Sequence, residues 1–268
     1  MNKIVLVTGA SSGIGKAISE VLASAGWTVY SVSRSASESM STTPGITSMA
    51  MDVTKPESVA AVVDYVIRKH GKIDAVINNA GTGFNGPAEN ITNDEIRSNF
   101  ELNVLGAWNV SRAVLPAMRS QGDGYIISIS SIAGLMGLPY RSVYSATKHA
   151  LEGFMESLSM EVKRFGIHVS IIEPAEFKTS IIQNRGSAHF VDTIYRDDME
   201  RVVKQINAGV AGAAEPAIVG TCVLAILNSK HPKLRYKIAP FGTKMSVVLK
   251  RILPDRMFEK ILMRHFGM

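Results

Sequence analysis

The stretch KIVLVTGASSGIG at residues 3–15 decides the fold of this chain of 268 residues. Residues 3–8 are apolar and rich in β-branched side chains, which is typical of a short buried strand. Gly9, Gly13 and Gly15 follow in a turn, and apolar residues at helical spacing run from about Ile14 to Ala25. A strand, a glycine-rich turn and a helix in this order predict a phosphate-binding turn for a dinucleotide, although the glycines alone also fit an ordinary tight turn.

The alternation of strand and helix continues beyond this turn. We expect strands at residues 28–33, 46–51, 73–78, 125–130 and 168–173, and helices at about 56–69, 98–120 and 142–164. These strands are apolar along most of their length, as parallel strands are when helices cover both faces of a sheet. A helix near 215–227 and a strand near 236–239 would complete the sheet.

The sequence therefore predicts an α/β fold with a single domain over residues 1–240, a doubly wound parallel sheet of the Rossmann type with helices on both faces. Residues 175–213 interrupt the alternation with polar, glycine-containing sequence, which predicts a mobile substrate-loop insertion with short helices. In residues 241–268, apolar residues recur at helical spacing between basic ones, and Pro254 separates two amphipathic helices.

The positive charge of the chain is concentrated near its C-terminus. The formal net charge is +6, and residues 230–268 hold ten Lys or Arg side chains against Asp255 and Glu259. No zinc-finger or RNA-binding signature accompanies this charge, so we expect no nucleic-acid partner. The two C-terminal helices could pack on the core or cap a substrate pocket, which we favour, or make a peripheral contact with an anionic membrane.

Cys222 is the only cysteine, which excludes an intramolecular disulfide and a cysteine-based metal site. We therefore expect no metal and a reducing, cytoplasmic location. No apolar run approaches the roughly 20 residues of a membrane span, and the opening MNKIVLVTGA does not fit a signal peptide.

The end of the second strand indicates which dinucleotide would bind. Ser33 and Arg34 stand there, and no Asp or Glu occurs between Thr28 and Ser37. An acidic residue would accept from a free ribose 2′-hydroxyl, whereas a guanidinium suits a 2′-phosphate, so NADP(H) is favoured over NAD unless Arg34 is simply a solvated loop residue. Asp52, with Val53, could meet the adenine or cap a helix near Thr54.

Tyr144 and Lys148 stand four residues apart on an expected helix, so their side chains share one face. An ammonium beside a phenol favours the phenolate, and the two groups form a general acid/base pair. Tyr65 and Lys69 repeat the spacing, but on a helix that begins far from the ligand-binding ends of the strands, so we interpret them as structural.

Ser131 follows the strand that precedes Tyr144, and its hydroxyl could bond a substrate carbonyl alongside the phenol. Ser130 is the competing candidate. Because successive side chains of a strand point to opposite faces, only one of the two serines should face the site.

Together these residues resemble the short-chain dehydrogenase/reductase family over roughly residues 1–240. The motifs are TGASSGIG at 8–15, DV at 52–53, NNAG at 78–81, Asn103 within NVLG, ISISS at 127–131 and YSATK at 144–148. The resemblance implies a catalytic set of Asn103, Ser131, Tyr144 and Lys148, with Asn103 holding a relay water. It implies a cofactor-binding set of Gly9, Ser11, Ser12, Gly13, Ile14, Gly15, Ser33, Arg34, Asp52, Val53, Asn79, Ala80, Gly81, Tyr144, Lys148, Pro174, Ala175 and Thr179.

One segment departs from the family pattern. Where the family usually has Pro-Gly, this chain has Pro174 and Ala175, followed by Glu176, with Thr179 at the family's threonine position. If the position needs a positive φ, Ala175 costs about 1 kcal/mol or more. Glu176 also brings a carboxylate near the expected nicotinamide.

The leading hypothesis is an NADP(H)-dependent enzyme that interconverts a ketone or aldehyde and an alcohol. The loop at 127–144 and the tail at 253–268 resemble most the branch with 17β-hydroxysteroid and retinol dehydrogenases, which implies a lipophilic small-molecule substrate. A 3-oxoacyl thioester reductase and a non-catalytic dinucleotide-sensing protein are the alternatives. The helices at 98–120 and 142–164 resemble the family's dimerising pair, which implies a homodimer or homotetramer, although their apolar faces could equally pack on the sheet.

Overall fold

The computed structural model describes residues 2–36, 39–40, 43–177, 186–187, 194–211 and 213–268. Its centre is a sheet with the strand order β10-β8-β7-β5-β1-β2-β4-β3. The strands are β1 (Ile4–Thr8), β2 (Thr28–Ser33), β3 (Ser39–Met40), β4 (Ile46–Ala50), β5 (Ala75–Asn78), β7 (Gly124–Ile129), β8 (Ile167–Pro174) and β10 (Arg235–Ile238). All pairings are parallel except that of the two-residue edge strand β3. The predicted Rossmann-type sheet is confirmed.

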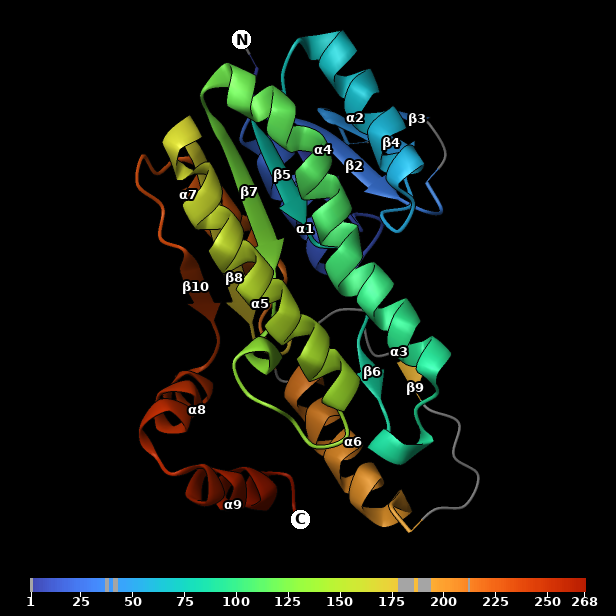
Figure 1. Cartoon of the computed structure of the whole chain (residues 1–268), viewed down its shortest axis with the longest axis vertical. Coiled ribbons are helices and arrows are strands. Elements are labelled where there is room, and N and C mark those ends of the chain that lie inside the picture. Colours follow the sequence, from blue (N-terminus) through green and yellow to red (C-terminus); the bar gives the residue numbers. More distant parts are fainter. Residues whose placement is uncertain (1, 37–38, 41–42, 178–185, 188–193, 212) are drawn as a thin grey trace.

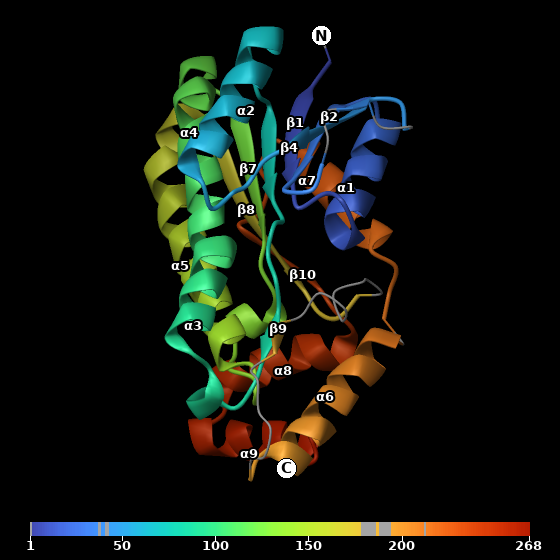
Figure 2. The same cartoon turned by 90° about the vertical axis from the view of Figure 1, so that its right-hand side faces the viewer.

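Helices cover both faces of the sheet (Figure 2). One face packs against α2 (Pro56–His70), α4 (Gly106–Gln121) and α5 (Ser142–Val162), and the other against α1 (Gly13–Ser24) and α7 (Ala217–Leu227). Each face buries its own cluster of aliphatic side chains. This double covering is why the strands are apolar along their length.

The sequence predicted one helix over residues 98–120, and this was wrong. The structure has α3 (Asn93–Phe100), a π-helical turn at Glu101–Leu105 and then α4. The helix starts early because Thr92 and Glu95 form a reciprocal capping box. The π turn widens the helix where Asn103 lies, and such turns are frequent at functional sites.

The region expected to hold only short helices contains a helix of 16 residues, α6 (Arg196–Ala211), so that prediction was also wrong. A second small sheet pairs β6 (Phe84–Asn85) with β9 (Gly186–Ser187). The last two helices are α8 (Phe241–Ile252) and α9 (Asp255–His265), with Pro254 between them as predicted. α6, α8 and α9 gather at the C-terminal ends of the strands (Figures 1 and 2).

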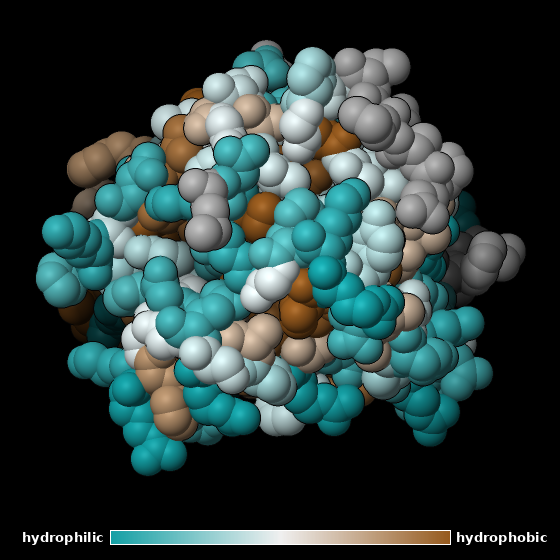
Figure 3. Space-filling view, turned by 90° about the horizontal axis from the view of Figure 1, so that it is seen from above, coloured by the Kyte–Doolittle hydropathy of each residue, from teal (hydrophilic) through white to brown (hydrophobic). Residues whose placement is uncertain are grey.

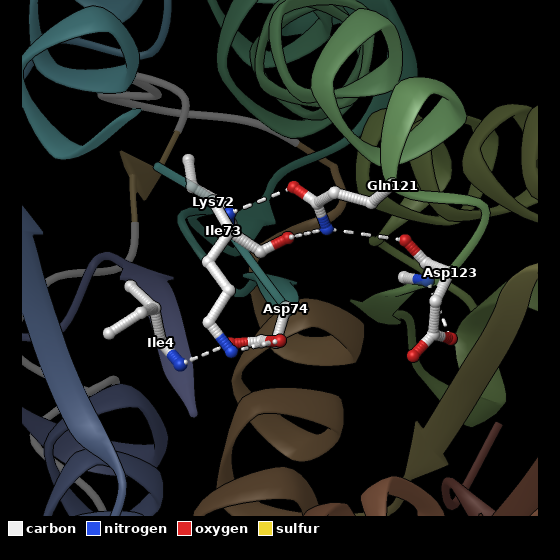
Figure 4. Close-up of polar contacts among 7 residues, drawn as sticks. Ile4, Lys72, Ile73, Asp74, Gln121 and Asp123 are labelled. Atoms are coloured by element: carbon white, nitrogen blue, oxygen red, sulfur yellow. Dashed lines mark hydrogen bonds and ion pairs between the residues drawn. The ribbon is translucent and has the colours of Figure 1, made fainter. Parts of the chain in front are cut away.

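The opposite end of the sheet is closed by polar contacts (Figure 4). The Asp74 carboxylate accepts from the Ile4 backbone N–H at 2.6 Å and pairs with Lys72 Nζ at 2.9 Å. The Gln121 side chain bonds both the N–H and the C=O of Ile73. Seen from this end, the surface is mostly hydrophilic with scattered apolar patches (Figure 3). Hydrogen bonds and an ion pair therefore close the N-terminal end of the sheet, whereas three helices gather at its C-terminal end.

Candidate active site

A cleft lies at the C-terminal ends of β1, β5, β7 and β8, where the strand order reverses. In open parallel sheets this switch point is the ligand-binding position. The described lining residues are Gly9, Ser12, Gly13, Ile14, Asn79, Ala80, Gly81, Thr82, Ile129, Ser130, Ser131, Arg141, Tyr144, Lys148, Pro174, Ala175, Glu176 and Phe177. The structure thus brings together motifs that are spread over more than half of the sequence.

The glycine-rich turn has the shape that a pyrophosphate requires. Gly9 and Gly13 have φ values of 63° and 56°. A Cβ on Gly15 would lie 2.4 Å from Asn79 Nδ2 and 2.5 Å from the Gly9 carbonyl oxygen, so only glycine allows this approach. No side chain caps α1 at Ser12, which leaves its first amides to the cleft. These residues fit a dinucleotide phosphate.

The NNAG segment is fastened to this turn. Thr8 Oγ1 accepts from the backbone N–H groups of Asn79 and Ala80 at 3.0 and 2.9 Å. Asn79 Nδ2 donates to the carbonyls of Thr8 and Gly9. The ends of β1 and β5 are therefore held together at the floor of the cleft.

The residues expected at the adenosine lie at the ends of β2 and β4, further along the same sheet edge. Arg34 is exposed, and its charge reaches Asp52. Burial would raise the pKa of Asp52, but hydrogen bonds from Thr54 and the charges of Arg34 and Lys55 hold it below its usual value. Asp52 Oδ1 accepts from both Thr54 N and Oγ1, which closes a local turn before α2; the N-cap residue of α2 is Lys55, so Asp52 does not cap this helix. Val53 is buried and its carbonyl accepts from Asn109.

Tyr144 and Lys148 are both buried in the first turns of α5 and both line the cleft. Lys148 Nζ donates to the Ile129 carbonyl at 2.9 Å and lies 5.8 Å from the centre of the Tyr144 ring. Burial lowers the pKa of Lys148, although Tyr144 and Glu152 act in the opposite direction. Strand β7 therefore fixes the ammonium beside the phenol.

Asn103 joins this group from the π turn, where it is 1% exposed. Its Oδ1 accepts from Thr82 N at 2.8 Å, and its Nδ2 donates to the Thr82 carbonyl and to Thr147 Oγ1. A Cβ on Gly81 would lie 3.0 Å from Asn103 Oδ1 and 3.8 Å from Lys148 Nζ. Because Gly81 has no side chain, the space between the Asn103 amide and the Lys148 ammonium stays open.

A second, larger cavity of about 1180 Å³ opens beside the cleft. The two share Ser131, Arg141, Ala175, Glu176 and Phe177. Its other walls come from the loop before α5, with Met136, and from the inner faces of α6, α8 and α9, with mostly aliphatic and aromatic side chains such as Ile206, Leu249, Phe258 and Leu262. The C-terminal helices therefore cap a pocket with one face each.

The two adjacent serines differ in what they reach. Both line the cleft, but only Ser131 also lines the larger cavity. Ser131 Oγ accepts from Ala133 N at 3.1 Å, which leaves its own proton available. Ser130 is 2% exposed and its Oγ lies against Gly134, towards Glu152. The geometry favours Ser131.

At residues 175–176, where the sequence departs from the family pattern, the backbone is unstrained and Glu176 forms an ion pair. Tyr140 is the only described non-glycine residue with a positive φ, so Ala175 carries no such strain. Glu176 Oε1 pairs with Arg141 Nη1 at 3.2 Å, and the Arg141 guanidinium carbon lies 4.4 Å from the centre of the Tyr144 ring. Arg141 and Phe177 line this site but are not among the residues predicted from the sequence. A lone arginine three residues before Tyr144 in an apolar loop was the available signal. Thr179 lies outside the described residues.

A family model described as short chain dehydrogenase matches residues 3–189. The chain belongs to the short-chain dehydrogenase family. A 3-ketodihydrosphingosine reductase of Bacteroides thetaiotaomicron is 37% identical over 262 residues, covering 97% of this chain and 96% of that protein. Human 17-beta-hydroxysteroid dehydrogenase type 1 is 32% identical over 277 residues, covering 94% and 81%. The family is one of oxidoreductases, and the branch suggested by the sequence is among the relatives.

Solved structures show the same fold. A short-chain dehydrogenase from Streptomyces avermitilis superimposes with a TM-score of 0.82 at 32% identity, covering 97% of both chains. Another, from Burkholderia phymatum, was solved with NAD (TM-score 0.79, 22% identity, 93% of both chains), and actinorhodin polyketide ketoreductase with NADPH (0.74, 25%, 89% and 96%). The described residues hold no cluster of metal-ligating side chains and no helix that could cross a membrane.

Proposed function

We propose that this short-chain dehydrogenase uses NADP(H) to interconvert a lipophilic ketone or aldehyde and the corresponding alcohol. The observation that carries the proposal is the junction of the two cavities. The cleft with the glycine turn, Tyr144 and Lys148 opens at Ser131 onto a mostly apolar cavity of about 1180 Å³. A carbonyl at this junction would meet the acid while its apolar body fills the larger cavity.

In this proposal Tyr144 donates its phenolic proton to the carbonyl oxygen, and the Ser131 hydroxyl donates a hydrogen bond to the same oxygen. Lys148, fixed on the Ile129 carbonyl, stabilises the phenolate that remains. Asn103 holds the turn at residues 81–82 and, in this proposal, would also hold a relay water. Gly81 and Pro174 line the part of the cleft that would hold a nicotinamide, whose chemistry when bound would be hydride transfer.

The choice of NADP(H) rests on Ser33 and Arg34 and on the absence of an acid at the end of β2. It is tested by titrating NADPH and NADH into the wild-type chain and into Arg34→Ala. We expect Arg34→Ala to weaken NADPH by roughly tenfold or more and to leave NADH nearly unchanged, because the guanidinium would bond the 2′-phosphate. Arg68→Ala removes an exposed arginine from α2 and serves as the control. Equal affinities of the wild type for both cofactors would refute the choice.

The substrate class is tested by turnover with 3-ketodihydrosphingosine, a steroid ketone, retinal and a 3-oxoacyl thioester. Reduction of a long-chain, steroid or retinoid carbonyl with NADPH supports the proposal. Turnover of the thioester alone would assign a 3-oxoacyl thioester reductase instead. Tight cofactor binding without turnover of any carbonyl would point to a dinucleotide-sensing protein.

A further inference from the structure

Arg141 is a charged group in an otherwise apolar place. Its side chain is 5% exposed, yet it lines both the cleft and the larger cavity. Arg141 occupies the N-cap position of α5 without a side-chain capping bond, and the preceding residue, Tyr140, has a φ of 56°. A bulky residue rarely adopts this conformation. The backbone is thus held in a costly shape that turns Arg141 inwards.

The guanidinium is only partly satisfied. Nη1 bonds Glu176 and the plane lies over the Tyr144 ring, but the buried Nε has no hydrogen-bond partner within the part of the chain that the structure describes. A buried donor without an acceptor is unfavourable, so this guanidinium has unused hydrogen-bonding capacity. Arg141 lines both cavities beside Ser131, so an oxygen acceptor on a ligand there would gain a charge-assisted hydrogen bond from the guanidinium.

We propose that Arg141 and Glu176 form a subsite for an oxygen-bearing group close to the reacting carbonyl. This inference rests on the proposed function and narrows its substrate class. The substrate would be amphipathic, with a hydroxyl, ester or amide oxygen near the carbonyl accepting from the Arg141 guanidinium, and with an apolar tail against α6, α8 and α9. Glu176 fixes the guanidinium and is a positioning residue.

The test compares a long-chain 3-oxo ester with a plain ketone of the same length, in wild type, Arg141→Met, Arg141→Lys and Glu176→Gln. For the ester, we expect Arg141→Met to lower kcat/KM by about ten- to a hundredfold, the range of a charge-assisted hydrogen bond. The loss for the plain ketone should stay within about threefold. Arg141→Lys keeps the charge but loses the planar set of guanidinium donors and should not restore the preference. Glu176→Gln should weaken the preference less than Arg141→Met.

Three results would overturn the subsite. Equal losses for the two ketones would make Arg141 a structural residue, and a matching rise in the Kd of NADPH would assign it to the cofactor. Restoration of the preference for the ester by Arg141→Lys would show that only the positive charge at position 141 matters, and not a guanidinium subsite. Failure of the wild type to reduce either ketone would instead refute the proposed function.

A second observation concerns the outer face of α8. Phe241, Met245, Val248 and Ile252 stand at positions i, i+4, i+7 and i+11 and are all exposed, so they form one apolar stripe in water. Phe241 and Ile252 are 79% and 69% exposed. On α9, Met257 and Ile261 are exposed as well. Clustered apolar residues on a surface mark an interaction site.

The charges beside the stripe indicate its partner. Lys250 and Arg256 pair with Asp255 and Glu259. The other four cations of these helices have no acidic partner among the described residues; they are Lys244, Arg251, Lys260 and Arg264. Ile261 both lines the larger cavity and is exposed, so the cavity reaches this surface. We infer that α8 and α9 dock on an anionic lipid surface, from which an apolar substrate enters the cavity.

The test is co-sedimentation of the full chain with vesicles of phosphatidylcholine, with and without phosphatidylserine. We expect binding only to the anionic vesicles, weakened by salt, and reduced about five- to tenfold by Ile252→Ser. Met160→Ser is the matched control, because Met160 on α5 is equally exposed at 69%. Equal binding by all three chains would refute the surface. A dimer that Ile252→Ser dissociates, without vesicle binding, would make the occupant a second copy.

Discussion

Helices α2 and α5 carry the same pair of residues at the same spacing, but in different surroundings. On α2, Lys69 is exposed and its Nζ donates to Tyr65 OH at 3.4 Å. This bond, with nearby Tyr30, raises the pKa of Lys69. On α5, Lys148 is buried and bonds a strand carbonyl, and burial lowers its pKa. Tyrosine and lysine four residues apart therefore do not define a site.

The difference follows from which end of each helix holds the pair. α2 runs back from the C-terminal ends of the strands, so its last turn, with Tyr65 and Lys69, lies near the closed end of the sheet (Figure 1). α5 starts at the open end and carries Tyr144 and Lys148 in its first turns. The cleft, Ser131 and Asn103 also lie at this open end of the sheet.

The largest expected effect separates the two tyrosines. Tyr144→Phe should lower kcat by roughly 10²–10⁴-fold, the usual contribution of a general acid, and leave NADPH binding intact. Tyr65→Phe should leave kcat within about twofold, because its phenol bonds Lys69 and its ring packs against Tyr30, away from the cleft. Both are measured by steady-state turnover. Retention of more than about a tenth of the activity in Tyr144→Phe would remove the proposed role.

The lysines give a second, smaller contrast. Lys148→Met should lower kcat/KM by about 10²-fold, since it removes a preorganised charge from the reacting end of the cleft. Lys69→Met should have no measurable effect. A pH profile of kcat/KM distinguishes the loss of a catalytic charge from a folding defect. A folding defect should lower the maximum and leave the shape of the profile unchanged, whereas loss of the ammonium should also move its alkaline limb. An unchanged profile would make Lys148 a purely structural residue.

Much of this comparison could be predicted from the sequence. Tyr144 and Lys148 were predicted to lie on the ligand-binding side because their helix follows a strand end, and the structure agrees with that placement. The reason given for Tyr65 and Lys69, a helix that begins far from the C-terminal ends of the strands, was wrong: α2 begins just after β4 and carries the pair towards its other end. The strands were predictable because burial on both faces leaves a plain apolar signature. The π turn at residues 101–105 was not, because the apolar spacing of residues 98–120 also fits a continuous helix.

The role of Arg141 in the site was hidden for a different reason. Its burial depends on Glu176, which lies 35 residues further along the chain, and on the unusual backbone at Tyr140. Neither is a local property of the sequence. The pairing of β6 with β9 is equally non-local, since two-residue strands a hundred residues apart leave no periodic pattern.

A third contrast concerns stability. Arg235 lies between Glu152 on α5 and Glu173 on β8, which is 0% exposed and is also 3.3 Å from Lys237. Breaking a buried ion pair costs roughly 3–5 kcal/mol. Since Lys237 remains and Arg235 is partly exposed, we expect Arg235→Met to lower the free energy of unfolding by about 2 kcal/mol. Lys69→Met on the surface of α2 should change it by less than about 0.5 kcal/mol. Denaturant unfolding measures both free energies. Equal effects of the two substitutions would show that the ion pairs of Arg235 contribute no more to stability than an exposed lysine does.

The smallest effect belongs to the end of α2. His70 Nε2 lies 2.7 Å from Tyr30 OH, and burial, with the charges of Lys69 and Lys72, lowers the pKa of His70 below its ordinary 6.5. The unfolded chain then binds more protons than the folded one near that pH, so the free energy of unfolding falls as the pH is lowered through about 6.5 and is recovered above it. His70→Gln can still accept from Tyr30 and should lose this part of the pH dependence. If wild type and His70→Gln respond identically between about pH 5 and 8, where an unperturbed histidine titrates, the surroundings of His70 do not shift its pKa and it makes no contribution to the pH dependence of folding.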